Sequence, residues 1–501
     1  MGRTSIGFVS ALAVTLCAGC AVVEPRPDYD RTAKHVTAAT GYVWGPWPDD
    51  EAVARQRVGE LLQDGLTADE AAEVCLWNNR ALQAALFTVG AARADVVQAG
   101  LLSNPTLSIG LRFPDAGGLA NFEAALVQNL ADLWQIPARR RVAERALERG
   151  ILDVAHQVST AVRDAKGAYW RARQADRQRE LAAESVQVAR QVLDLALARQ
   201  QAGAGGEVDV NLARAEVQDA ELALQRAELA AVAARIELLT RLSLTIAPEA
   251  LALTDSLPET AVQTLDDDAL VVMAADHRLD LRAAAQVAEA AAARIVEEQL
   301  KLLPTLEVGV GLERAERRAP SGRNILADSL RASLAEGKPQ VDIAPKEPSG
   351  GQDTVIGPTL GLELPIFNQN QGGIARARFE YEQSRRLLDD LVVQATQDVR
   401  RAAARARSAW GTAGYYRDEV LPLRTASLEL ARTAYQAGRA PLLSVLEVER
   451  ALLAARQGYA ESLAAAATAI VELEQAVGWP AREISAGLGD AAETERIGVL
   501  P

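Results

Sequence analysis

The chain has 501 residues, of which 49% are hydrophobic but only 4% aromatic, and its formal net charge is −14 at pH 7. This acidic balance excludes a nucleic-acid-binding protein of the usual kind, because such proteins need clustered Lys and Arg to neutralise phosphates. Aromatic side chains normally supply much of a globular core, so their scarcity predicts helices that pack closely through small residues.

The first residues of the chain have the pattern of an export signal. Arg3 gives a positive start, an apolar run extends from Ser5 to Leu16, and the segment ends in Ala18-Gly19-Cys20. The run is too short for a transmembrane helix. Its ending resembles a bacterial lipoprotein signal, in which cleavage leaves Cys20 as a lipid-carrying N-terminus, although Cys17 stands where such signals usually have Leu. An ordinary secretory signal with a chance cysteine is the alternative.

The rest of the chain offers neither a disulfide framework nor a helical membrane span. Cys75 is the only cysteine outside the leader, so internal disulfides are not expected. No window of 18 consecutive apolar residues follows the leader. Any structure that crosses a membrane must therefore be β, because a bilayer admits only helices and closed sheets.

Most of the chain is an internal duplication. Pro105-Thr106-Leu107 returns as Pro304-Thr305-Leu306, and Gln201-Ala202-Gly203 returns as Gln436-Ala437-Gly438. Such repetition defines the domain organisation before any other signal. The predicted organisation is a signal peptide at 1–19, an extended segment at 20–69, a first repeat at 70–246, a connector at 247–270, a second repeat at 271–479 and a tail at 480–501.

Each repeat contains two segments that predict β-strands, at about 106–113 and 122–130 and at about 305–312 and 355–366. In the first of these, Leu107, Ile109 and Leu111 alternate with small or polar residues. Period-two alternation indicates a sheet with one apolar and one polar face. A soluble sheet gives the same pattern, but runs of about 8–11 residues also suit tilted strands that cross a bilayer.

Four strands cannot close on themselves in lipid, since the smallest membrane barrels need about eight. An open edge would leave backbone groups unpaired. The membrane interpretation therefore requires a symmetric oligomer, with about twelve strands from three chains or eight from two. The polar insert at 313–353 is predicted to be a long, mobile surface loop.

The helical segments of each repeat are too long for a compact domain. Residues 138–201 alone form a rod of roughly 90 Å, and the other long run, 373–437, is expected to bend near Pro422. Helices at about 72–102 and 208–242, and at about 279–303 and 442–477, are predicted to stack beside the long ones. A heptad stripe predicts coiled-coil contact; a soluble helical bundle is the alternative. Its residues are Val208, Ala215, Leu222, Leu229 and Ile236.

These features together resemble the TolC-type outer-membrane efflux proteins, in their lipoprotein branch. The turn Tyr435-Gln436-Ala437-Gly438, continuing through Pro441 to Ser444, is similar to the helical tip motif of that family. The first repeat matches at Gly203 and Asp209. The corner Leu364-Pro365-Ile366-Phe367 before Gly372-Gly373 is similar to the strand-to-helix corner, whereas the first repeat has Arg139-Arg140-Arg141 in place of the glycines.

The resemblance implies a mainly α, internally duplicated fold with long coiled-coil helices that form a periplasmic α-barrel. Four strands per chain would contribute to an outer-membrane β-barrel of a homotrimer, about twelve strands in all. It also implies a passive exit duct of a tripartite efflux system, lipid-anchored in the outer membrane and coupled to an inner-membrane pump. A periplasmic adaptor would dock at Gly203, Asp209, Gly438 and Ser444, although these residues also suit ordinary helix ends. Glu207 and Asp209 are candidates for an acidic aperture that favours cations.

Nothing in the sequence predicts an enzyme, a cofactor or a metal centre. His35, His156 and His277 are far apart and lack the neighbours of a metal site. Phosphate-binding glycine loops and hydrolytic triads are also missing. The alternative to a conduit is a lipid-anchored periplasmic coiled-coil scaffold without channel activity. The exported substrate stays open, because drugs, metal ions, solvents and polypeptides all leave through similar tunnels.

Overall fold

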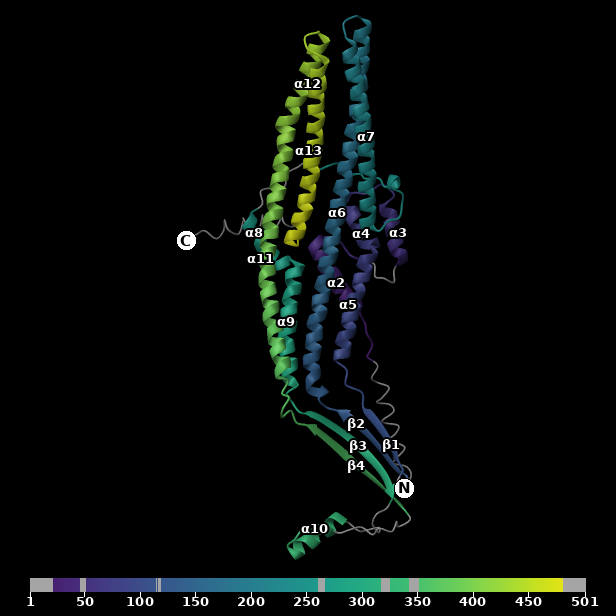
Figure 1. Cartoon of the computed structure of the whole chain (residues 1–501), viewed down its shortest axis with the longest axis vertical. Helices are drawn as coiled ribbons and strands as arrows, with labels where there is room; N and C mark the ends of the chain where they lie inside the picture. The colour runs from purple at the N-terminus through teal and green to yellow at the C-terminus, as the bar shows by residue number, and fades with distance from the viewer. Residues whose placement is uncertain are drawn as a thin grey trace, which may run out of the picture. The chain divides into compact units, whose positions relative to one another are not determined.

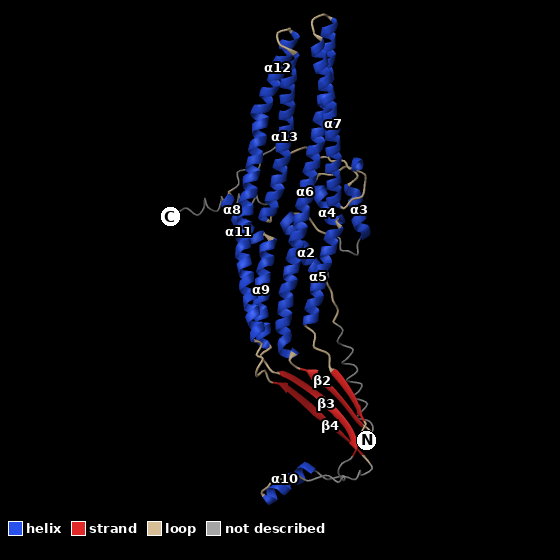
Figure 2. Ribbon diagram, in the orientation of Figure 1, coloured by secondary structure: helices blue, strands red, loops and turns tan. Residues whose placement is uncertain are grey.

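The computed structural model describes residues 21–45, 51–113, 115, 119–259, 266–316, 325–341 and 351–480. The chain forms two compact units. The first takes the described residues up to Ala94, Arg145–Ala288 and those from Gln383 onward, and the second takes Asp95–Glu144 and Glu289–Glu382. Helices build the first unit and strands lie in the second (Figures 1 and 2). The predicted signal peptide with Cys20, and the tail beyond Pro480, lie outside the described residues.

The second unit contains one antiparallel sheet with the strand order β1-β2-β3-β4 (Figure 1). Its strands are β1 (Thr106–Arg112), β2 (Asn121–Asn129), β3 (Thr305–Glu316) and β4 (Gln352–Glu363). The two repeats meet at its centre, where β2 pairs with β3. Strands β1 and β4 form the edges and have no further strand partner in the part of the chain that the structure describes. The small β part predicted from the sequence is confirmed.

One face of this sheet is apolar across all four strands. The register places Leu107 opposite Leu126 and Val308 opposite Leu360. These side chains are open to solvent in the single chain, with exposed fractions of 63% for Leu107 and 73% for Leu360. The other face carries Gly, Ser, Thr and charged residues. A continuous exposed apolar face is unusual for a monomer in water and marks a contact surface.

Most helices belong to the first unit (Figure 1). It contains α2 (Arg26–Thr40), α3 (Glu51–Leu61), α4 (Ala68–Asn78), α7 (Glu207–Leu242), α8 (Asp267–His277), α12 (Leu421–Gln436) and α13 (Leu442–Val477). Four helices have residues in both units: α5 (Arg80–Ala99), α6 (Asp132–Gln201), α9 (Leu279–Leu300) and α11 (Gln371–Tyr415). No helix within the described ranges has a stretch of 18 residues apolar enough to cross a bilayer.

The duplication is visible in the hydrogen bonds where helices join. Between α4 and α5, Asn79 Nδ2 donates to the Arg241 carbonyl near the end of α7, at 3.2 Å. Between α8 and α9, Arg278 Nη1 donates to the Ala476 carbonyl near the end of α13, at 3.3 Å. Each junction therefore satisfies carbonyls that a helix end leaves without an internal partner. The predicted single helix at about 72–102 is wrong, because Asn79 leaves the helical conformation with a ψ of 110°.

The second long helix is interrupted near Pro422, as predicted. A short π-helical stretch, Tyr416–Val420, separates α11 from α12. Proline has no N–H to donate within a helix, so the preceding turn changes its hydrogen bonding. On α13, Gly458 lies so close to Tyr416 that an added Cβ would be 2.5 Å from its hydroxyl. The wide turn is thus packed against a glycine.

Two regions contain helices that the sequence did not predict. The insert at 313–353 was expected to be a loop, but β3 continues to Glu316, β4 begins at Gln352 and α10 covers Ile325–Glu336. This prediction is wrong, because Leu326, Leu330 and Leu334 recur at helical spacing among good helix formers. Residues 317–324 and 342–350 lie outside the described residues.

The segment at 20–69, expected to be extended, forms α2 and α3 over much of its length. Helix α2 is held on α5 by Asp28, whose side chain is 1% exposed and accepts bonds of 2.5 and 2.6 Å from Arg93. Tyr29 packs closely beside it, since an added Cβ at Gly90 would lie 2.7 Å from the Tyr29 hydroxyl. Tertiary contacts of this kind stabilise a helix that the local sequence pattern does not predict.

The predicted heptad stripe does not pack inside the chain. Helix α7 buries a different set of side chains, among them Val210, Ala213 and Leu238. In the stripe, Val208 is 71% exposed and Leu229 is 72% exposed. The angular offset between the two sets points the stripe away from α6, so a partner for the predicted coiled-coil contact is not supplied by that helix. The stripe is a second exposed apolar surface.

Candidate functional site

Two helical hairpins end in turns of the same geometry. In the first, α6 ends at Gln201 and Gly203 has a φ of +72°, a conformation that glycine adopts without strain. The Ala204 N–H donates to the Arg199 carbonyl at 2.8 Å, as in a Schellman motif. Helix α7 then begins at Glu207 behind the cap residue Gly206.

The second turn repeats this pattern at the corresponding positions. Gly438 has a φ of +70°, and the Arg439 N–H donates to the Ala434 carbonyl at 2.8 Å. Helix α13 follows the cap residue Pro441, whose carbonyl accepts a 2.7 Å bond from the Ser444 hydroxyl. Gly203 and Gly438 therefore serve as helix ends in both repeats, and Ser444 supports a helix start.

Asp209 and Glu207 lie in the first turn of α7. Carboxylates are favourable there, because the helix dipole and free N–H groups attract negative charge. Glu207 is exposed and Asp209 is partly buried. Burial and the nearby Asp209 carboxylate raise the pKa of Tyr435, on the other hairpin. Asp209 therefore influences the electrostatics of both hairpins.

Arg199 joins the two turns, and sequence reasoning missed it. Its Nη1 donates to the Tyr435 carbonyl at 2.8 Å and to the Gln436 carbonyl at 3.3 Å, while Nη2 donates to the Ala204 carbonyl at 3.2 Å. The guanidinium carbon also lies 4.7 Å from the centroid of the Tyr435 ring, within cation–π range. The available signal was an arginine in the last turn of a helix before glycine, where it can bond free carbonyls.

An apolar cluster lies below this contact and includes residues from all four hairpin helices. Its members are Val192, Ala196, Val210, Ala213, Leu428, Tyr435, Leu442, Val445, Leu446 and Leu452. Buried area of this kind is the main stabilising contribution in helix packing. The two turns are therefore held together by an apolar base and the Arg199 contact.

Replacing Arg199 with Ala is expected to loosen the turns without unfolding the helices. The loss of its hydrogen bonds to carbonyls of both turns should reduce the free energy of unfolding by about 1 kcal/mol. Limited proteolysis should cleave at 202–206 and 437–441 faster than in the parent chain. The control is Arg190→Ala on the same helix, which removes an exposed ion pair to Glu221 of 2.7 Å and should cost at most about 0.5 kcal/mol. Equal proteolysis of the two variants would contradict the assigned role.

His35 and His156 are partly buried and lie away from the turns. Burial, assisted by Arg282 and Arg31 and opposed by Glu148, lowers the pKa of His35 from its ordinary value of 6.5. Burial likewise lowers the pKa of His156, while Asp280 opposes this and Arg278 adds to it. Across the described ranges no group of three or more His, Cys, Asp and Glu residues is arranged to hold a metal ion.

These histidines predict acid sensitivity. The unfolded chain takes up their protons near pH 6.5 and the folded chain only at lower pH, so stability that is present above pH 6.5 is lost as the pH falls below it. The unfolding temperature should fall between about pH 6.5 and 5, and the double variant His35→Gln/His156→Gln should show a flatter profile. A parallel decline in the parent and variant would assign the effect to other groups.

The sequence and the fold both resemble those of known proteins. A family model described as outer membrane efflux protein matches residues 72–242 and 270–479. Among solved structures, a membrane protein from Pseudomonas aeruginosa has a TM-score of 0.65 at 18% identity, with 82% of this chain and 93% of that chain covered. The Campylobacter jejuni CmeC outer membrane channel has a TM-score of 0.63 at 16% identity, with 85% and 89% covered.

The outer membrane protein VceC from Vibrio cholerae gives a TM-score of 0.63 at 17% identity, with 82% of this chain and 96% of that chain covered. Among curated proteins, none matches the sequence. The structural similarities establish a shared fold, and the predicted resemblance to TolC-type channels is confirmed. Because the family model matches both repeats and more than half of the chain, this protein belongs to the outer membrane efflux protein family.

Proposed function

We propose that this protein is the outer-membrane exit duct of a tripartite efflux system, which passively conducts solutes from the periplasm to the exterior. The observation that carries the proposal is the sheet, whose apolar face is exposed across all four strands and whose edges β1 and β4 are unpaired within the described chain. A lipid environment suits such a face, and neighbouring copies suit such edges.

The assembly we propose is a homotrimer in which three sheets close on one another. A second surface supports it, since the exposed stripe on α7, with Leu229 72% exposed, suits contact between helices of neighbouring copies. Closure by two copies would give a narrower ring of about eight strands. Cross-linking followed by native mass spectrometry in detergent distinguishes the two stoichiometries.

The family membership supports the proposed partners. An inner-membrane pump would supply the energy, and a periplasmic adaptor would dock on the hairpin turns at Gly203, Asp209, Gly438 and Ser444. Two features support docking there: the turns share one geometry, and Arg199 holds them as one surface. The chain would be anchored to outer-membrane lipid through Cys20 and would extend into the periplasm.

Glu207 and Asp209 are proposed to line an acidic aperture where the turns of several copies converge. Their position in the first turn of α7 places two carboxylates per chain beside the turn. Fixed negative charge raises the local concentration of cations. The variant Glu207→Gln/Asp209→Asn should therefore lower the cation preference of single channels, measured from reversal potentials in a salt gradient. Unchanged cation selectivity would show that these carboxylates do not line the aperture.

Conductance in planar bilayers tests the main proposal. The purified protein should form discrete channels, and it should require detergent even after Cys20→Ala. A lipid-anchored scaffold is the competing function, and it predicts that Cys20→Ala makes the protein soluble without detergent and that no channels form. The exposed apolar sheet favours the duct.

A further inference from the structure

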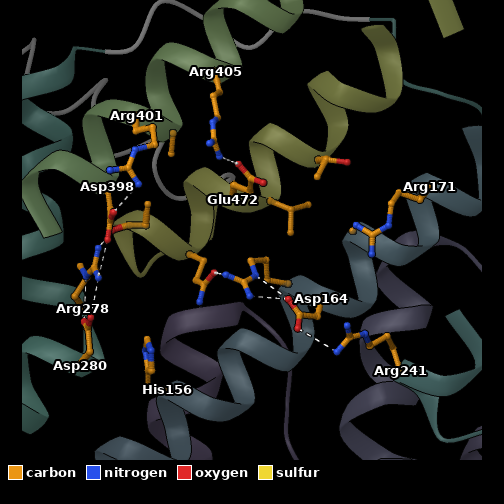
Figure 3. A pocket seen from close by; sticks show the side chains of 17 residues that line it. His156, Asp164, Arg171, Arg241, Arg278, Asp280, Asp398, Arg401, Arg405 and Glu472 are labelled. Atoms are coloured by element: carbon orange, nitrogen blue, oxygen red, sulfur yellow. Dashed lines mark hydrogen bonds and ion pairs between the residues drawn. The ribbon is translucent and has the colours of Figure 1, made fainter. Parts of the chain in front are cut away.

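A cavity of about 540 Å³ in the first unit is lined mainly by charged side chains (Figure 3). Its walls come from α6, α11 and α13, the end of α7 and the junction between α8 and α9. This volume lies in the range of small-molecule sites. The guanidinium groups that line it belong to Arg163, Arg171, Arg241, Arg278, Arg401 and Arg405.

Positive charge exceeds negative charge in this cavity. Six arginines face four carboxylates, those of Asp164, Asp280, Asp398 and Glu472, which leaves two positive charges. Glu237, which pairs with Arg171 from outside the lining, reduces the excess to one. Burial lowers the pKa of His156 from its ordinary value of 6.5, which favours the neutral ring. A positive cavity is unexpected in a chain whose net charge is −14.

The excess arises because carboxylates are shared between arginines. Asp164 accepts from Arg163 at 2.6 Å and lies 3.4 Å from Arg241. Asp398 lies 3.2 Å from Arg401 and 3.7 Å from Arg278. One carboxylate cannot neutralise two guanidinium groups. A network that served only to hold helices together would instead match its charges pair by pair.

Three arginines at the cavity have more N–H donors than their ion pairs use. We call Arg171, Arg401 and Arg405 the rim arginines. Each makes an ion pair, Arg171 with Glu237 at 2.8 Å, Arg401 with Asp398 at 3.2 Å and Arg405 with Glu472 at 3.1 Å. A guanidinium carries five N–H donors. Their side chains are 46%, 60% and 60% exposed, so a ligand can reach them, whereas Arg278 is 10% exposed and committed to Asp280.

We propose that this cavity binds a compact oxyanion with two or more negative charges, held by the rim arginines. Guanidinium groups bind carboxylate and phosphate oxygens through paired, charge-assisted hydrogen bonds. Several such groups around one opening favour a multivalent anion over chloride or a monocarboxylate. The shared chemistry fits a small polycarboxylate or a phosphate compound, and the site is independent of whether the protein conducts solutes.

The test uses the full chain in detergent and isothermal titration calorimetry at matched ionic strength. Citrate and pyrophosphate are the two probes, and acetate is the monovalent comparison. Saturable binding of citrate, pyrophosphate or both, at least about tenfold tighter than acetate, supports the proposal, and the probe that binds identifies the oxyanion. Binding of neither probe above the acetate level overturns it.

Matched variants distinguish the effect of the cavity arginines on anion binding from the effect of overall positive charge. Arg171→Gln/Arg405→Gln should weaken binding about a hundredfold, roughly tenfold for each charge-assisted contact. The control, Arg190→Gln/Arg400→Gln, removes the same charge from the same helices, where ion pairs to Glu221 and Asp268 lie outside the cavity. Equal weakening by both variants would overturn the site.

A third variant protects the test against a folding defect in the double mutant. Thr468 lines the cavity and is partly buried on α13. Thr468→Glu adds a negative charge there and removes none of the ion pairs. It should abolish binding of the probe while the thermal unfolding profile stays that of a folded protein. Undiminished binding by a folded Thr468→Glu protein would place the oxyanion elsewhere and overturn the proposal.

Discussion

Replacing Leu222 and Leu229 with Asp is expected to convert the assembled protein into monomers. Both side chains lie on the exposed α7 stripe, with exposed fractions of 49% and 72%. Helix α7 contacts its own chain through other residues, such as Ala213 and Leu238, so the monomer should still fold. Burial of each leucine between copies is worth about 1.5–3 kcal/mol, and a buried unpaired carboxylate would add a large penalty.

Light scattering after size-exclusion chromatography in detergent measures this change. The matched control is Ala223→Asp/Ala230→Asp, which adds the same charge at the same spacing on exposed positions of the same helix. These alanines lie about 100° around the helix from the stripe. The control should retain the mass of the oligomer. A Leu222→Asp/Leu229→Asp protein that keeps its oligomeric mass would show that the stripe is not the contact surface.

Local patterns explain which parts of the fold were predicted. The strands follow from alternation, since a period of two fixes the face of every side chain, and Leu107 opposite Leu126 continues the apolar face into the next strand. The hairpin turns follow from glycine, because Gly203 and Gly438 adopt a positive φ that other residues avoid. In both cases the information lies within a few residues.

What the sequence did not predict depends on residues that are distant along the chain. Arg199 donates to the Tyr435 carbonyl, 236 positions away. No short sequence pattern predicts a contact between residues so far apart along the chain. The cavity needs side chains from five helices. The partner of the α7 stripe was not predicted for a related reason: a heptad establishes that a face is apolar, but the partner that covers it is set by packing. The junction at Asn79 similarly depends on carbonyls of α7.

Gly309 is expected to be essential to the sheet although glycine generally weakens strands. It lies in β3, between β2 and β4. A Cβ at this position would be 2.5 Å from the Leu126 carbonyl oxygen and 2.7 Å from the Thr359 hydroxyl. The carbonyl belongs to the paired backbone and cannot move aside without separating the strands. Gly309→Ala should therefore cost about 1–3 kcal/mol, as overpacking does elsewhere.

Gly311 provides the matched control, because it lies two residues along the same strand on the same face. A Cβ there would meet its nearest neighbour, a methyl group of Thr359, at 3.4 Å, which is an ordinary contact. Gly311→Ala should be neutral or stabilising by about 0.4–1 kcal/mol, since it restricts the unfolded chain. The assay is the fraction of protein recovered as folded oligomer after graded heating in detergent. If Gly309→Ala destabilises the folded oligomer and Gly311→Ala does not, the steric constraint lies where β2 pairs with β3 and the two repeats are joined. Equal effects of the two substitutions on stability would refute it.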